Sequence, residues 1–130
     1  MLTWTLLSAL SCKEPEPWCV PAEGASVTVC TEDEAGGELT VREVLWYRDA
    51  DDPDYDGEHD AVCANDACSV WAVEAGLTGE INVAARYYGP PHYTPGCAFL
   101  DSASALVTLD GLEAPLVTLE LDTTAEECND

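Results

Sequence analysis

The stretch Glu80-Ile-Asn-Val-Ala-Ala-Arg-Tyr-Tyr88 decides the fold class of this 130-residue chain. Its apolar or aromatic side chains Ile81, Val83, Ala85 and Tyr87 recur at every second position. Successive side chains of a β-strand point to opposite faces, so a period of two predicts a strand with one buried face. The rest of the sequence offers no convincing amphipathic helix that would compete with this pattern.

Five other segments have the same strand-like character: residues 25–31, 39–48, 69–74, 104–109 and 116–121. In segment 39–48 the alternation changes phase between Val41 and Val44, which predicts a β-bulge. Val27 and Val29 share one face of the first segment. The inward positions expected in the last segment are Val117, Leu119 and Leu121. Gly, Pro and Asp-Gly turn signals separate the segments, which predicts an all-β, antiparallel β-sandwich of about seven strands.

The charge of the chain excludes two classes of partner. It carries 26 Asp and Glu against 4 Lys and Arg, a formal net charge of −22. Nucleic-acid binding needs clustered basic side chains, and so does electrostatic docking on an anionic membrane surface. The 47% share of hydrophobic residues is nevertheless ordinary for a folded domain.

The N-terminus has the character of an export signal. Residues 1–11 are uncharged and largely apolar, but too short to span a bilayer. They end in Ala9-Leu10-Ser11-Cys12, which resembles the lipobox of bacterial lipoproteins. That resemblance implies a signal peptide over 1–11 and a lipid on Cys12 that anchors the protein to a membrane. The alternatives are a signal cleaved without lipidation and an ordinary first strand.

The seven cysteines fit this interpretation. With Cys12 assigned to lipid, six remain as an even set, which predicts a disulfide-stapled domain: Cys19, Cys30, Cys63, Cys68, Cys97 and Cys128. Six cysteines permit 15 pairings, so the sequence does not reveal the connectivity. Cys63 and Cys68 are close enough to close a local loop, and Cys19 and Cys128 flank the predicted domain and could tie its ends together. The spacings lack the close ligand pairs of structural zinc sites.

The expected organisation has four parts. The signal peptide (1–11) is followed by a disordered, lipid-anchored tether rich in Pro and Glu (12–24), the β-sandwich (25–122) and an acidic C-terminal tail (123–130). In bacterial lipoproteins the residue after the lipidated cysteine influences sorting. By that resemblance Lys13 implies the outer membrane or cell surface, with a secreted or periplasmic protein as the alternative.

Residues 25–122 resemble the carboxypeptidase regulatory-like, or transthyretin-like, β-sandwich domains of exported bacterial proteins. The resemblance rests on the first strand with its acidic Gly turn, on Val41–Tyr47, on residues 79–89, and on two closing strands at 106–109 and 117–121. Such domains are mostly non-catalytic modules, so the resemblance implies no reaction. The protein or glycan that such a module would contact stays unknown.

One segment suggests a cation site. Residues 49–60 hold seven acids, and within them Asp52-x-Asp54-x-Asp56-Gly57 matches the opening of a calcium loop. Asp60 falls at loop position 9 and the carbonyl of Glu58 at position 7. Position 12, where a bidentate Glu belongs, is a cysteine, so another acid would have to complete the shell. The alternative is a solvated acidic loop between two strands.

An aromatic, proline-rich loop is the second candidate site. Its potential ligand-binding residues are Tyr87, Tyr88, His92 and Tyr93. Planar side chains on a loop suit stacking against a carbohydrate or a proline-rich peptide. In the alternative interpretation, Tyr87 is a core residue and the prolines stiffen a connection.

No enzyme signature was found. The sequence lacks GxSxG, HExxH, GxxxxGK[ST] and GxGxxG motifs. With 26 acids, coincidental carboxylate pairs are inevitable and carry no argument for glycoside hydrolysis. We therefore expect a non-catalytic protein with no catalytic residues.

Overall fold

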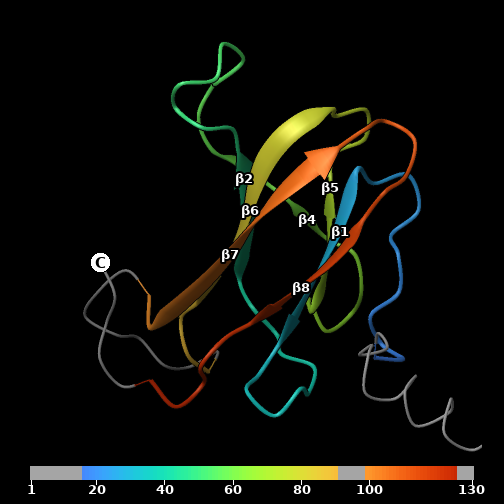
Figure 1. Cartoon of the computed structure of the whole chain (residues 1–130). Coiled ribbons are helices and arrows are strands. Elements are labelled where there is room, and N and C mark those ends of the chain that lie inside the picture. The colour runs from blue at the N-terminus through green and yellow to red at the C-terminus, as the bar shows by residue number, and fades with distance from the viewer. Residues whose placement is uncertain (1–15, 91–98, 126–130) are drawn as a thin grey trace, which may run out of the picture.

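The computed structural model describes residues 16–90 and 99–125, and these contain eight strands (Figure 1). The strands are β1 (Val27–Glu32), β2 (Glu43–Tyr47), β3 (His59–Asp60), β4 (Val62–Cys63), β5 (Val70–Val73), β6 (Gly79–Tyr87), β7 (Asp101–Leu109) and β8 (Leu116–Glu120).

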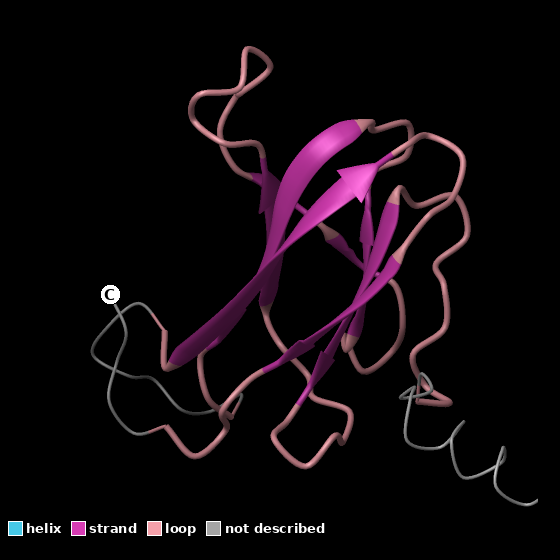
Figure 2. Cartoon of the chain, viewed as in Figure 1, coloured by secondary structure: helices cyan, strands magenta, loops and turns pink. Residues whose placement is uncertain are grey.

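The strands form two four-stranded sheets in the orders β4-β5-β1-β8 and β3-β2-β6-β7. The two sheets are the two layers of a sandwich, and strands and loops account for all of the described chain (Figure 2). The predicted all-β sandwich is therefore confirmed. The pairings are antiparallel except that β8 runs parallel to β1. The last strand therefore forms an edge of the first sheet, beside the first strand.

The alternating side chains of β6 form the centre of the core. Ile81, Val83 and Ala85 are fully buried, and Tyr87 is nearly so. Burying side chains of this kind stabilises the fold by roughly 1.5–3 kcal/mol each. From β8, Leu119 is buried against them, as predicted. The period of two thus identified both the strand and the face that it buries.

Strand β1 differs from this pattern because all six of its residues are buried. Val27 and Val29 face the core between the sheets. Cys30, on the opposite face, packs with Cys19 and Val70 in a second apolar cluster. Residues 16–24 cover that outer face.

The expectation of a tether separate from the domain is therefore wrong for residues 16–24. The Sγ atom of Cys19 is bonded to that of Cys30, and the Ala22 amide donates a 2.8 Å hydrogen bond to Thr28 Oγ1. The residue composition of this segment suggested a solvated linker, but the disulfide holds it against β1. Residues 1–15, with the predicted signal peptide and Cys12, lie outside the described residues.

The predicted strand 39–48 is two separate segments. The Leu39 amide donates to Thr31 O (3.0 Å) and the Val41 amide to Cys68 O (3.2 Å), so residues 39–41 follow the first sheet. Residues 43–47 then form β2 and pair with β6 in the second sheet. The phase change that predicted a bulge marks the point where the chain crosses between sheets, which lets Val41 and Val44 both face the core.

The sequence did not predict two of the strands. Strands β3 and β4 are two residues long and lie directly after the acidic loop. A two-residue strand contains no alternation to detect, and its position depends on its neighbours. Strand β7 begins at Asp101, three residues before the predicted start.

The disulfides resolve part of the connectivity. Cys63 is bonded to Cys68, as expected for a local loop, whereas Cys19 is bonded to Cys30 and not to Cys128. Cys12, Cys97 and Cys128 lie outside the described residues. The expectation of three disulfides then leaves Cys97 to pair with Cys128.

The loop closed by Cys63 and Cys68 is organised by Asn65. Its Oδ1 atom accepts hydrogen bonds from the amides of Ser69 (3.0 Å) and Val70 (3.2 Å), and its Nδ2 atom donates to Ser69 Oγ (3.0 Å). The Ser69 hydroxyl donates in turn to Glu38. Because Ser69 is fully buried, these bonds satisfy polar groups that would otherwise be costly to bury.

We predict that replacing Cys19 and Cys30 together by alanine lowers the free energy of unfolding by about 3 kcal/mol, because the cross-link no longer restricts the unfolded chain. Urea titration measures this change. Limited proteolysis should also cut the variant within residues 16–24, which lose their link to β1. The matched control replaces Cys63 and Cys68, whose smaller loop should contribute about 2 kcal/mol and whose loss should leave residues 16–24 resistant. Unchanged stability and unchanged proteolysis in the first variant would contradict this role.

Candidate functional site

The acidic loop between β2 and β3 projects away from the sandwich (Figure 1). Hydrogen bonds within the loop set its shape: the Asp52 amide donates to Asp49 O (2.9 Å) and the Tyr55 amide to Asp52 O (3.0 Å). The carboxylate of Asp52 accepts the amide of Asp54 at 2.8 Å. Short side chains that accept nearby amides are typical of turns, so Asp52 acts here as a turn residue.

Of the other proposed cation ligands, Asp56 and Glu58 contact basic groups, Asp60 lies on a strand, and Asp54 takes part in the turn through its backbone amide. Asp56 Oδ1 lies 2.7 Å from His59 Nε2, and Glu58 Oε2 lies 3.5 Å from Arg86 Nη2. The His59 ring stacks on the Trp46 ring, with 4.4 Å between the centroids. Asp60 belongs to β3 and pairs with β2.

Over residues 16–90 and 99–125, no three His, Cys, Asp or Glu side chains come together in a group that could hold a metal ion. Calcium binding by the acidic loop stays a prediction. It would require further oxygen ligands around Asp52, Asp54 and Asp56, because calcium takes six to eight of them.

Of the proposed ligand-binding residues, the structure describes Tyr87 and Tyr88, and it places them differently. Tyr87 is buried against the core, whereas Tyr88 is half-buried and its hydroxyl donates to Glu43 Oε1 at 2.7 Å. The Arg42 guanidinium lies over the Tyr88 ring, 5.0 Å from the centroid. His92 and Tyr93 lie outside the described residues, so ligand binding by this loop stays a prediction.

A largely apolar hollow of about 250 Å³ lies beside Tyr88. It is lined by Leu39, Thr40, Val41, Arg42, Tyr87, Tyr88, Gly89 and Pro90. Residues 39–42 are far from the tyrosines in sequence, and only the crossing between the sheets brings them there. Sequence reasoning therefore missed half of this hollow.

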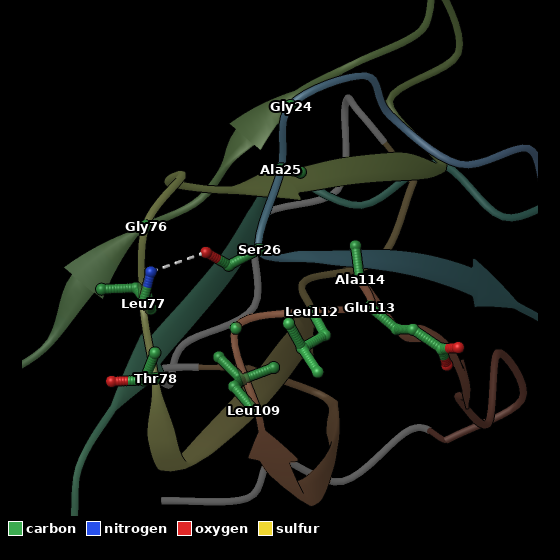
Figure 3. A pocket seen from close by; sticks show the side chains of 11 residues that line it. Gly24, Ala25, Ser26, Gly76, Leu77, Thr78, Leu109, Leu112, Glu113 and Ala114 are labelled. Carbon is green, nitrogen blue, oxygen red and sulfur yellow. Dashed lines mark hydrogen bonds between the residues drawn. The ribbon is translucent and has the colours of Figure 1, made fainter.

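A larger hollow of about 410 Å³ opens at one end of the sandwich (Figure 3). Its residues come from three loops and the end of β7: Gly24, Ala25, Ser26, Gly76, Leu77, Thr78, Leu109, Gly111, Leu112, Glu113 and Ala114. The Leu77 amide donates to Ser26 Oγ at 2.9 Å, which ties two of these loops together. No signal in the sequence pointed to this hollow.

Among the described residues that line the larger hollow, Glu113 is the one ionisable side chain. The Leu112 side chain is 88% exposed at the rim.

All three arginines of the chain contact structural groups. Arg42 lies over Tyr88, and Arg48 Nη1 donates to the carbonyl of Thr78 at 3.0 Å. Arg86 Nη1 lies 3.2 Å from Glu43 Oε1. Each guanidinium therefore binds a group of the domain itself.

No family model, no curated protein and no solved structure matches this chain. Within the described ranges, the structure contains no helix long and apolar enough to cross a membrane.

Two tyrosines link the stability of the fold to pH. Burial, the hydrogen bond to Glu43 and the charge of that carboxylate raise the pKa of Tyr88 above its ordinary value. Burial and the charge of Glu34 raise the pKa of Tyr87. A phenol whose pKa is higher in the folded state stabilises the fold below its unfolded pKa of about 10, and this stabilisation is lost as the pH rises through the folded pKa.

We therefore predict that the melting temperature falls as the pH rises above about 10. The Tyr88→Phe variant should lose about 1 kcal/mol at neutral pH, where it lacks the hydrogen bond to Glu43, and its melting temperature should fall less steeply at high pH. Thermal melts followed by circular dichroism measure both effects. Tyr55→Phe, at an exposed position, is the control and should follow the wild type. A Tyr88→Phe variant with the wild-type slope would contradict the linkage.

Proposed function

We propose that this protein is an exported, lipid-anchored, non-catalytic β-sandwich module of the bacterial cell envelope. The observation that carries the proposal is the pair of disulfides, Cys19–Cys30 and Cys63–Cys68, in so small a domain. Disulfides persist in oxidising compartments and are rare in the cytosol, so they support export.

The two disulfides leave Cys12, Cys97 and Cys128, an odd set that a lipid on one of them would explain. Because Cys19 is bonded to Cys30, it is not available to Cys12. If Cys97 and Cys128 pair, Cys12 is the one cysteine left over, which is the parity expected of a lipidated residue. From Cys12 to Cys19 the chain can reach at most about 25 Å, so an anchor at Cys12 would keep the sandwich close to the membrane.

The arrangement of strands supports the module interpretation. The segments that carry the resemblance to carboxypeptidase regulatory-like domains all contribute strands, namely β1, β2, β6, β7 and β8.

We predict that intact-mass analysis of native protein from the membrane fraction gives the chain from Cys12 to Asp130 plus a lipid. Six thiols should become alkylatable only after reduction, and a digest without reduction should contain a peptide in which Cys97 is joined to Cys128. The Cys12→Ala variant should move to the soluble fraction with its disulfides intact.

The outcome that would contradict the proposal is an unlipidated, soluble wild-type protein that retains residues 1–11 and has free thiols. The Cys12→Ala variant separates anchoring from folding, since its melting temperature should equal that of the wild type.

A further inference from the structure

The four edges of the two sheets differ in how they are protected. Strands β3 and β4 are two residues long, and β8 has five residues and ends at Glu120. Strand β7 is an edge of nine residues, Asp101–Leu109. Long edge strands attract a further strand, and natural proteins usually shorten them or place charges, prolines or bulges on them.

Beyond Asp101, its first residue, strand β7 has none of these protections. Between Asp101 and Asp110 its sequence is Ser-Ala-Ser-Ala-Leu-Val-Thr-Leu, with no charge and no proline. Its pairing with β6 is continuous from Gly79 opposite Leu109 to Tyr87 opposite Asp101, so no bulge interrupts it. The exposed side chains are small or apolar, and Leu106 at the middle of the strand is 59% exposed.

Among the described residues, β6 alone forms a backbone ladder with β7. In an edge strand, about half of the amide and carbonyl groups point away from the single partner strand. Apart from the ladder with β6, the hydrogen bonds among residues 16–90 and 99–125 include none to the backbone of residues 102–109. A partner chain in an extended conformation could therefore form a regular ladder there.

The charges at the two ends of β7 indicate what kind of chain would fit. Asp101 Oδ2 accepts the amide of Asp122 at 2.7 Å, and Asp110 Oδ1 accepts the amide of Leu112 at 2.8 Å. These bonds hold one carboxylate at each end of an uncharged strand. Opposite charges on adjacent strands stabilise pairing and like charges oppose it.

A second copy of this chain fits poorly. An antiparallel β7–β7 pair centred on Ala105 would place Asp101 of each copy opposite Leu109 of the other, one residue from Asp110. Each copy would also bring a net charge of −22. The neighbouring carboxylates and the net charges of the two copies would both cause repulsion.

We propose that β7 is a docking edge for an extended segment of a partner protein, with small or apolar residues at its centre and Lys or Arg near each end. The basic residues would lie opposite Asp101 and Asp110, and a β-branched or apolar residue would pack beside Leu106. The docking edge does not depend on the lipid anchor or on either hollow.

The test uses the full-length, oxidised protein and a blocked peptide of alternating Thr and Val with two Lys at each end. NMR amide shifts and hydrogen exchange report where the peptide binds. We expect shifts and new protection at residues 102–109 and none at β3 or β4. Binding should weaken as salt is added, and the same peptide with Glu in place of Lys should not bind.

Two variants test the surface itself. Leu106→Lys should weaken binding at least about tenfold, because it places a like charge beside the basic peptide. Val62→Lys is the matched control: it adds the same charge at a 67% exposed position on β4 and should bind as the wild type does. Leu106→Glu also removes the leucine but adds no like charge, so it should weaken binding less than Leu106→Lys does.

Three results would overturn the proposal. The first is that the Lys-flanked peptide leaves the amides of β7 unchanged. The second is that the Glu-flanked peptide binds equally well, which would remove the role of charge. The third is protection of β7 by self-association without any peptide, which would make the occupant a second copy.

Discussion

Strand β1 is buried on both faces and paired on both edges, and the rest of the sandwich depends on this arrangement. Its inner face contributes Val27 and Val29 to the core, and its edges pair with β5 and β8. The outer face would normally meet water in a two-layer sandwich, but residues 16–24 cover it and the bond from Cys19 to Cys30 holds them there. A polar strand such as Val-Thr-Val-Cys-Thr-Glu can be buried because its side chains find partners: Thr28 accepts the amide of Ala22, and Thr31 donates to the carbonyl of Leu39.

The elements around β1 are held by many bonds, whereas those at the periphery of the sandwich are held by few. Around β1, the disulfide and two ladders hold every neighbouring element in place. Farther away, the acidic loop projects from the sandwich and is held to it by contacts such as those of Asp49 with Asn82 and Glu58 with Arg86. The exposed edge at β7 lies on the side of the sandwich away from β3 and β4. Possible binding features therefore lie at the periphery, on a scaffold that the first strand fixes.

The local sequence predicted the strands that contain many alternating residues. It did not predict the features that tertiary contacts determine, such as sheet membership and disulfide pairing. The period of two located β6 and the face buried by Ile81 and Val83, because a nine-residue strand contains enough repeats to show it. The crossing at Arg42 produced a phase change, but nothing in the sequence distinguishes a change of sheet from a bulge. The pairing of Cys19 with Cys30 was one of 15 possible connectivities, and the folding back of residues 16–24 could not be read from a Pro- and Glu-rich composition.

For the candidate sites too, the sequence suggested residues but not their contacts in the fold. Asp52, Asp54 and Asp56 have the spacing of a cation loop, but spacing does not reveal that Asp52 caps its own turn or that Asp56 contacts His59. The hollows combine segments that are distant in sequence. The exposed edge of β7 depends on strand order, since the same nine residues would be unremarkable in the middle of a sheet.

Native-state hydrogen exchange tests the central place of β1 most directly. If β1 is the element on which the fold depends, the amides of Thr28, Val29, Cys30 and Thr31 that bond within the two ladders should exchange most slowly, and only through global unfolding. Their exchange free energy should then match the free energy of unfolding from urea titration. Slower exchange in β2 or β6 than in β1, with β1 opening in a separate local event, would contradict the account.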